Sequence, residues 1–250
     1  MRSFIIAIII CFSPISSQTG YEIAKMVDEK PKPRFLSNKI EMVLKNSRDK
    51  TRTKQMISKS MNGGEKQIMW FLKPKTDYGV SFLKIEHDKG QDEMRIWLPN
   101  FGRVRRISSK KKGDSFMGSD LSYEDLSNRN LNDNKYIRLE DETVDEINCY
   151  VLEIRPIGNI KTSYSKHISC INKSTLVTKK EKSYDKKGNL IKDKSFDYIF
   201  LEGYSVLNYV FIKNVQKNHT TQVYFSEIVL NSKIDEDIFN EKSLQNMPVD

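Results

Sequence analysis

Alternation of apolar and polar residues along most of the chain constrains its fold more than any other feature. Ile40, Met42 and Leu44 alternate with Lys39 and Glu41, and the same period of two recurs in separate segments almost to the end of the chain. Successive side chains of a β-strand point to opposite faces of its sheet. The pattern therefore predicts about ten strands.

Short turn sequences separate these segments. Asn62-Gly63-Gly64 and Lys187-Gly188-Asn189 are typical of hairpins, and strands joined in this way pair antiparallel because parallel pairs need long crossovers. Residues 68–72 and 198–201 are apolar on both faces, which a sheet with one solvated face does not need. We therefore expect either two packed sheets or one strongly curved sheet with helices or a ligand on its concave side.

Three short helices are expected beside the strands. Residues 21–28 (YEIAKMVD) form the first, which Pro31 and Pro33 prevent from continuing. The second lies near residues 123–126, and the third follows the acidic residues 235–237. The predicted fold class is mostly β with a minor helical part (α+β).

Residues 1–17 have the layout of a secretory signal peptide. Arg2 gives a positive start, an apolar run extends from Phe4 to Phe12, and small residues precede Gln18. The apolar run is too short to span a membrane. Since no linker and no fixed repeat divides the rest, residues 18–250 are expected to form one exported domain.

The net charge of +9 arises from 42 Lys+Arg and 33 Asp+Glu. Nucleic acid is not an expected partner, because an exported protein does not meet it. The densest basic run comprises Arg103, Arg105, Arg106 and Lys110–Lys112. It is interpreted either as a solvated face or as a contact with an anionic membrane or a partner.

No motif indicates catalysis. His87, His167 and His219 lie in no spacing that suits zinc or a nucleophile–base pair, and His167 is predicted on an outward face among serines. The nucleophile elbow, a phosphate-binding glycine loop and paired C-x-x-C thiols are missing from the sequence. We therefore expect no catalytic residue, no metal site and no cofactor.

Two cysteines follow the predicted signal peptide, Cys149 and Cys170. Export permits a disulfide between them. The alternation, however, places Cys170 on a face with Ile168, and Cys149 on the face opposite to Leu152. Bridged residues on paired strands share a face, so a bridge is expected only if a bulge intervenes.

Residues 115–126 place the adjacent apolar Phe116 and Met117 among Gly, Ser and Asp. These two side chains should tuck under other parts of the protein, because exposing them is costly. Ser122 and Asp125 have the spacing of a capping arrangement for a short helix. The segment is interpreted either as a local plug at the sheet or as a movable lid over an apolar cavity.

Several segments resemble the LolA-like outer-membrane lipoprotein-sorting protein family, the broad LolA/LolB-like group. The clearest are Leu98-Pro99, Gly102 to Ile107 (GRVRRI) and Phe116 to Leu126 (FMGSDLSYEDL), and the likeness covers most of residues 18–250. It implies one antiparallel sheet of about eleven strands that forms an incomplete barrel, with short helices as plug or lid over an apolar cavity.

The resemblance also implies a function. It indicates a periplasmic, non-enzymatic, monomeric carrier that binds lipid or the acyl chains of lipoproteins and helps to sort them toward the outer membrane. An inner-membrane transporter, an outer-membrane acceptor and an anionic membrane surface are the expected partners. Arg103, Arg105 and Arg106 are the candidate contacts. The candidate lining of the cavity is Ile40, Met42, Leu44, Met69, Phe71, Met94, Ile96, Leu98, Phe116, Met117 and Leu152.

Two alternatives remain open at this point. The candidate lining residues could instead fill a packed core, in a non-enzymatic envelope scaffold that works with an inner-membrane export pump and binds a protein partner. The other alternative is an enzyme whose Ser, His and carboxylate groups gather in one cleft, which the predicted strands do not suggest.

Overall fold

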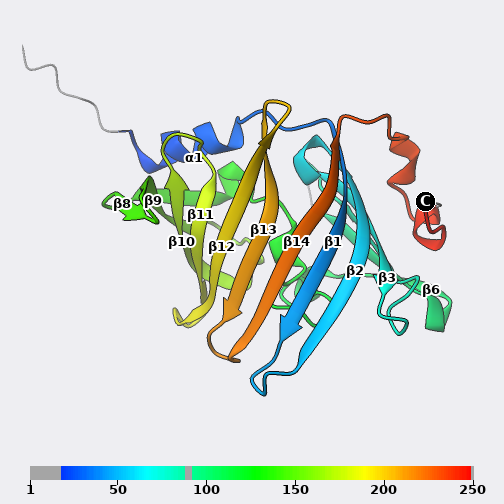
Figure 1. Cartoon of the computed structure of the whole chain (residues 1–250). Coiled ribbons are helices and arrows are strands. Elements are labelled where there is room, and N and C mark those ends of the chain that lie inside the picture. Colours follow the sequence, from blue (N-terminus) through cyan, green and yellow to red (C-terminus); the bar gives the residue numbers. More distant parts are fainter. Residues whose placement is uncertain (1–17, 88–91, 249–250) are drawn as a thin grey trace, which may run out of the picture.

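The computed structural model describes residues 18–87 and 92–248; the predicted signal peptide, residues 1–17, lies outside them. One antiparallel sheet of fourteen strands dominates the fold (Figure 1). The strands are β1 (Phe35–Lys45), β2 (Thr51–Met61), β3 (Lys66–Lys73), β4 (Ser81–Ile85), β5 (Glu93–Leu98), β6 (Arg103–Arg106), β7 (Asn134–Arg138), β8 (Glu142–Val144), β9 (Ile147–Pro156), β10 (Tyr164–Asn172), β11 (Thr178–Asp185), β12 (Leu190–Leu201), β13 (Tyr204–Asn214) and β14 (His219–Leu230).

The sheet is open. Its strand order is β6-β5-β4-β3-β2-β1-β14-β13-β12-β11-β10-β9-β7, with β8 also paired to β9. Within the described residues β6 and β7 are the two ends of this order and do not pair with each other. Of the two expected architectures, the single curved sheet is therefore confirmed.

The strand number of about ten, or eleven by resemblance, was too low. Strands as short as β8, which has three residues, and β6, which has four, pair with their neighbours. They are too short to show a recognisable alternation. Tyr78, predicted within a strand, instead lies in the turn before β4.

Helix α1 (Gly20–Asp28) is confirmed where it was predicted. Thr19 and Glu22 form a capping box at its start. Ile23 packs against Leu152 and other residues of β9 and β10. Gly20 permits this approach, because a Cβ atom there would lie 2.8 Å from the backbone oxygen of Tyr136 and the backbone nitrogen of Arg138, both on β7.

The register divides the sheet into an inner and an outer face. Met42 of β1 lies opposite Val223 of β14, and directly paired residues of antiparallel strands point to the same side. The face that carries this pair is called the inner face. On the outer face, Trp70 and Leu83 are covered by the C-terminal segment, residues 234–247, which includes the 3₁₀ helices η6 (Glu236–Ile238) and η7 (Lys242–Gln245).

Candidate functional site

An apolar cluster fills the inner face of strands β1 to β5. Ten of the eleven candidate lining residues belong to it: eight are buried members, and Leu98 and Met117 pack against it partly buried. The other candidate, Leu152, lies under α1 instead. The structure therefore brings ten of the predicted side chains together in one cluster, and their role in binding a ligand stays a prediction.

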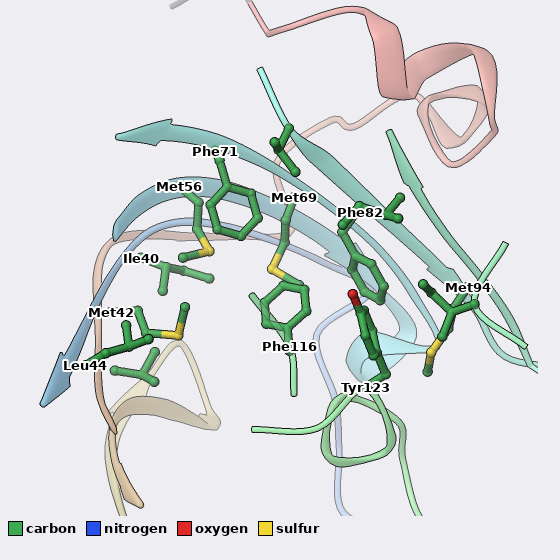
Figure 2. Close-up of a cluster of buried hydrophobic side chains, with 14 of the residues drawn as sticks. Ile40, Met42, Leu44, Met56, Met69, Phe71, Phe82, Met94, Phe116 and Tyr123 are labelled. Carbon is green, nitrogen blue, oxygen red and sulfur yellow. The ribbon is translucent and has the colours of Figure 1, made fainter. Parts of the chain in front are cut away.

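Residues 115–126, called the plug segment, occupy the space in front of this cluster. The ring of Phe116 lies 5.2 Å from that of Phe82 and 6.0 Å from that of Phe71, measured between ring centroids. Tyr123 lies 5.7 Å from Phe116 in an edge-to-face arrangement. Figure 2 shows both aromatic side chains turned toward the methionines of the sheet. The predicted burial of Phe116 is thus confirmed, and the predicted helix here is the 3₁₀ turn η4 (Glu124–Leu126).

Polar bonds at three places hold the plug segment to the sheet. Asp120 accepts a hydrogen bond from the Thr221 hydroxyl at 2.8 Å and lies 2.6 Å from Nδ1 of His219, both on β14. The Lys84 ammonium of β4 donates to the Leu126 carbonyl at 2.8 Å. Asp125 makes the third connection, to β10 and β12. The segment is therefore bonded to the sheet in its middle, at Asp120, and at its end, at Asp125 and Leu126.

Asp125 is the centre of a buried ionic network. Its carboxylate lies 2.5 Å from the Lys192 ammonium and 3.4 Å from that of Lys194, and the Tyr164 hydroxyl donates to it at 3.0 Å. The predicted capping arrangement is present, since the backbone N–H of Ser122 donates to Asp125 at 2.8 Å. Burial disfavours the charged carboxylate, but the two lysines outweigh this effect and hold the pKa of Asp125 well below its ordinary value.

Glu181 of β11 extends this network. It lies 2.8 Å from the Lys194 ammonium and receives two bonds from the Arg129 guanidinium, at 3.1 and 3.3 Å. The Ser169 hydroxyl also donates to it at 2.7 Å. Burial opposes ionisation of Glu181, and Arg129 and Lys194 overcome this, so that its pKa is also held well below the usual range.

The prediction of an outward, solvated His167 is wrong. His167 is only 6% exposed, and its Nδ1 lies 2.9 Å from the Ser183 hydroxyl and 3.5 Å from Glu181. Burial, with the positive charge of Arg129 nearby, lowers the pKa of this imidazole to about 3. The serines around it indicated a solvated face, whereas this face holds the buried network.

A chamber of about 580 Å³ opens beside the network. It is lined by the almost completely buried side chains of Asp125, Tyr164, His167, Glu181 and Lys194, and by residues of the segments 127–134 and 159–162. None of the eleven candidate lining residues borders it within the described part of the chain. Sequence reasoning missed this chamber because alternating charged residues on a strand are usually solvated.

The three candidate contact arginines lie on β6, at one end of the sheet. All three are exposed, but Arg103 and Arg105 pair with Leu98 and Ile96 and so share the inner face, whereas Arg106 points to the other side. The ring of Phe101, which is 64% exposed, lies 5.7 Å and 5.3 Å from the guanidinium carbons of Arg103 and Arg105. An exposed aromatic ring thus accompanies the positive charges.

Cys149 and Cys170 are free and buried. The prediction that they lie on opposite faces is nevertheless wrong. Cys149 pairs with Asn172 and Cys170 with Val151, so both cysteines share a face and are displaced diagonally. The two thiols are free because the cysteines are displaced along the strands, and not because they point to opposite faces of the sheet.

Two further features bear on the type of site. Among residues 18–87 and 92–248, no group of three or more His, Cys, Asp or Glu side chains is arranged to hold a metal ion. No helix in this part of the chain has the length and apolar character needed to cross a membrane.

Comparison with known proteins identifies relatives that share this fold. A family model described only as "-like: Uncharacterized protein" matches residues 63–246, and no curated protein matches the chain. An outer-membrane lipoprotein-sorting protein domain from Vibrio parahaemolyticus is 30% identical, with a TM-score of 0.85 over 91% of this chain and 98% of its own. A DUF1329 family protein from Desulfovibrio piger is 26% identical, with a TM-score of 0.86 over 90% and 98%.

A LolA superfamily protein from Nitrosomonas europaea shares the fold at 17% identity, with a TM-score of 0.72 over 91% of this chain and all of its own. The open antiparallel sheet is thus an architecture of the LolA type. At the level of family, the chain belongs to the LolA-like outer-membrane lipoprotein-sorting proteins.

Proposed function

We propose that the protein is a non-enzymatic periplasmic carrier that binds lipid, or the acyl chains of lipoproteins, on its inner face and helps to sort them toward the outer membrane. The observation that carries this proposal is the apolar cluster of β1 to β5, which is covered by a plug segment instead of by continuous secondary structure. Its methionines, among them Met42, Met69 and Met94, suit a variable ligand because their side chains are flexible and polarizable.

In the described conformation, side chains of the plug segment fill the position proposed for an acyl chain. Phe116 and Tyr123 are buried against the cluster, so a ligand enters only when this segment moves aside. Each methylene of the ligand that leaves water contributes about 0.8 kcal/mol. A chain of ordinary length can therefore replace the apolar contacts that Phe116 and Met117 give up, and the proposed lid is the plug segment itself.

The rest of the proposal concerns location and partners. Residues 1–17 act as the signal peptide and residues 18–250 as one domain, which the continuous strand order supports. The exposed Arg103, Arg105 and Arg106, together with Phe101, approach an anionic membrane surface, an inner-membrane transporter or an outer-membrane acceptor. The mature protein travels between membranes as a monomer.

The envelope scaffold is the second candidate, and one observation favours it. Phe116 is buried in the cluster and its ring lies 6.0 Å from that of Phe71, as expected of a protein that binds a partner through its surface and carries no lipid. The two functions differ in whether the plug segment leaves its place.

The mature protein, purified from a bacterial periplasm under mild conditions, tests the proposal by native mass spectrometry with organic extraction of any adduct. Bound lipid or an acylated peptide is the expected result. A bare protein that also takes up no fluorescent fatty acid would favour the scaffold.

A further inference from the structure

Asn38 of β1 has a buried side-chain oxygen that lacks a hydrogen-bond partner. The residue is only 8% exposed, and within residues 18–87 and 92–248 no donor reaches its Oδ1 atom. The Oδ1 atom of Asn208 on β13 is in the same situation. A buried acceptor without a partner costs free energy that an apolar side chain would avoid. A ligand that donates a hydrogen bond to Asn38 would offset this cost.

The register places Asn38 on the inner face, beside the apolar cluster. It lies four residues before Met42 on the same strand, and side chains separated by an even number of residues share a face. Its direct partner on β2 is Ser58, which pairs with Met69 of β3, which in turn pairs with Phe82 of β4. Met69 and Phe82 are buried members of the cluster. These four side chains, called the inner row, therefore connect the unpaired amide oxygen with the proposed acyl site.

Ser58 places a donor next to this acceptor. The residue is 1% exposed, and its Oγ accepts a hydrogen bond from Nε2 of Gln67 at 3.2 Å. A hydroxyl also has one proton to donate. On the other side of Asn38 the pairing of β1 with β14 shifts between Ser37 and Lys39, so no residue of β14 pairs directly with Asn38. An acceptor and a donor without charge thus lie side by side, as the N–H and C=O of an amide require.

The inner row also leads to the place that the plug segment fills. Phe82 is in ring contact with Phe116, at 5.2 Å between centroids (Figure 2). Strands β4 and β1 are three neighbours apart in the sheet, which corresponds to about 14 Å. This span is comparable to the length of an extended dodecyl chain. An acyl chain that replaces Phe116 and lies along the inner row therefore brings its polar end to Asn38.

We infer that Asn38 and Ser58 bind an amide group at the polar end of the cargo, whose acyl chain lies along the inner row toward Phe82. This inference rests on the proposed carrier function and adds to it the chemical class of the cargo, an acyl chain joined through an amide instead of an ester. The Oδ1 atom of Asn38 accepts a hydrogen bond from the amide N–H of the ligand. The Ser58 hydroxyl donates to the carbonyl of the ligand.

Two ligands that differ in one group test this inference. N-methyldodecanamide and methyl dodecanoate have the same chain and nearly the same shape, but only the amide has an N–H to donate. Each competes with a fluorescent fatty acid for the protein, and the ratio of their dissociation constants is the amide preference. We expect the amide to bind at least about fivefold more tightly, because it makes one additional hydrogen bond to a buried acceptor. N,N-dimethyldodecanamide, which has no N–H, should bind no more tightly than the ester.

Variants assign the amide preference to Asn38. Asn38→Leu replaces the amide by an apolar side chain of similar size and should abolish the preference without weakening the binding of the ester. Asn38→Ala should do the same and is the second variant if leucine disturbs the sheet. Asn208→Leu is the matched control, since it removes the other unpaired amide oxygen from outside the inner row. It should change the preference less than about twofold, and a circular dichroism melt checks the folding of each variant.

Each outcome has one meaning. Equal affinity of the unchanged protein for amide and ester overturns the amide inference and leaves the carrier function intact. A preference that persists in both Asn38 variants, or that is lost in Asn208→Leu instead, overturns it as well, because the amide then binds elsewhere. Failure of the fluorescent fatty acid and of both ligands to bind overturns the carrier function itself.

Discussion

Asp125 joins three separate parts of the chain through one carboxylate. It belongs to the plug segment and accepts hydrogen bonds from Lys192 of β12 and Tyr164 of β10. The ammonium groups of Lys192 and Lys194 beside it are almost completely buried, so neither can turn to water if the carboxylate is lost. Its charge is therefore matched to its surroundings and is not interchangeable with a neutral group.

Replacement of Asp125 by Asn tests this dependence. The variant should lose about 3–5 kcal/mol of unfolding free energy, because it leaves a buried lysine without its carboxylate. Urea denaturation measures the loss. Glu236→Gln is the matched control, since it breaks an exposed pair with Arg34 and should cost less than about 1 kcal/mol. Equal losses in the two variants would contradict the buried role of Asp125.

His167 makes the stability depend on pH. Its folded-state pKa of about 3 is below the ordinary value of about 6.5, so the unfolded chain binds a proton in acid that the folded protein does not. Stability is therefore lost as the pH falls below about 6.5. Between pH 7.5 and pH 5 the loss should be about 2 kcal/mol.

Urea unfolding of His167→Gln over this pH range checks the assignment. The variant should show a shallower dependence on pH, whereas His87→Gln, which changes an exposed histidine, should keep the original one. Asp125 and Glu181, whose folded-state pKa values are lowered, lose their contribution only in stronger acid, as the pH falls below about 4 toward those values.

At the scale of elements, the plug segment is stabilised by aromatic packing as well as by its ion pairs. Phe116→Ala removes the ring that contacts Phe71, Phe82 and Tyr123. The unfolding free energy should fall by about 3–5 kcal/mol, as for other buried Phe residues. The same variant should bind a fluorescent fatty acid more tightly than the unchanged protein, because less of the plug segment must be displaced. Weaker binding would show that Phe116 is part of the acyl site.

The C-terminal segment covers apolar side chains of the outer face, as the plug segment covers those of the inner face. The Trp70 indole N–H donates to the Ser243 carbonyl at 3.3 Å, and the Ser81 hydroxyl donates to the Leu244 carbonyl at 2.5 Å. Leu244 is 1% exposed, so Leu244→Ala should cost about 2–5 kcal/mol. Fluorescence of Trp70 and Trp97, which both belong to this outer-face cluster, measures the loss during denaturation. Fatty-acid binding should stay unchanged because the inner face is not altered.

The sequence predicted these elements unevenly, for physical reasons. The period of two revealed the long strands and the apolar side chains of the inner face, because burial of Met42 or Phe71 depends only on which side of a strand it occupies. It did not reveal the ionic network. Lys192, Lys194 and Glu181 lie at the alternate positions typical of a solvated face, and only the segment folded over them makes that face buried. Leu152 was misplaced for a similar reason, since the alternation does not tell which helix covers a strand.

At the scale of the whole molecule, the positive charges at the β6 end are the proposed contact with an anionic membrane. Reversal of Arg103, Arg105 and Arg106 to Glu should lower binding to anionic vesicles at least about a hundredfold, since each basic residue near such a surface contributes about 1 kcal/mol. Co-sedimentation with vesicles measures this. Reversal of Lys45, Lys50 and Arg52, exposed at the β1–β2 hairpin, makes the same change in net charge. An equal loss there would mean that only total charge matters.

The open edge at β6 has a consequence for association. An unclosed sheet ends in a row of unpaired peptide groups that another copy of the chain can extend. β6 is only four residues long, and three of them are arginines, so two copies aligned along this edge would bring their positive side chains against one another. A closed barrel has no edge and so excludes strand addition. Here, like charge at β6 discourages it, so the sheet can stay open around the plug segment without polymerising through this edge.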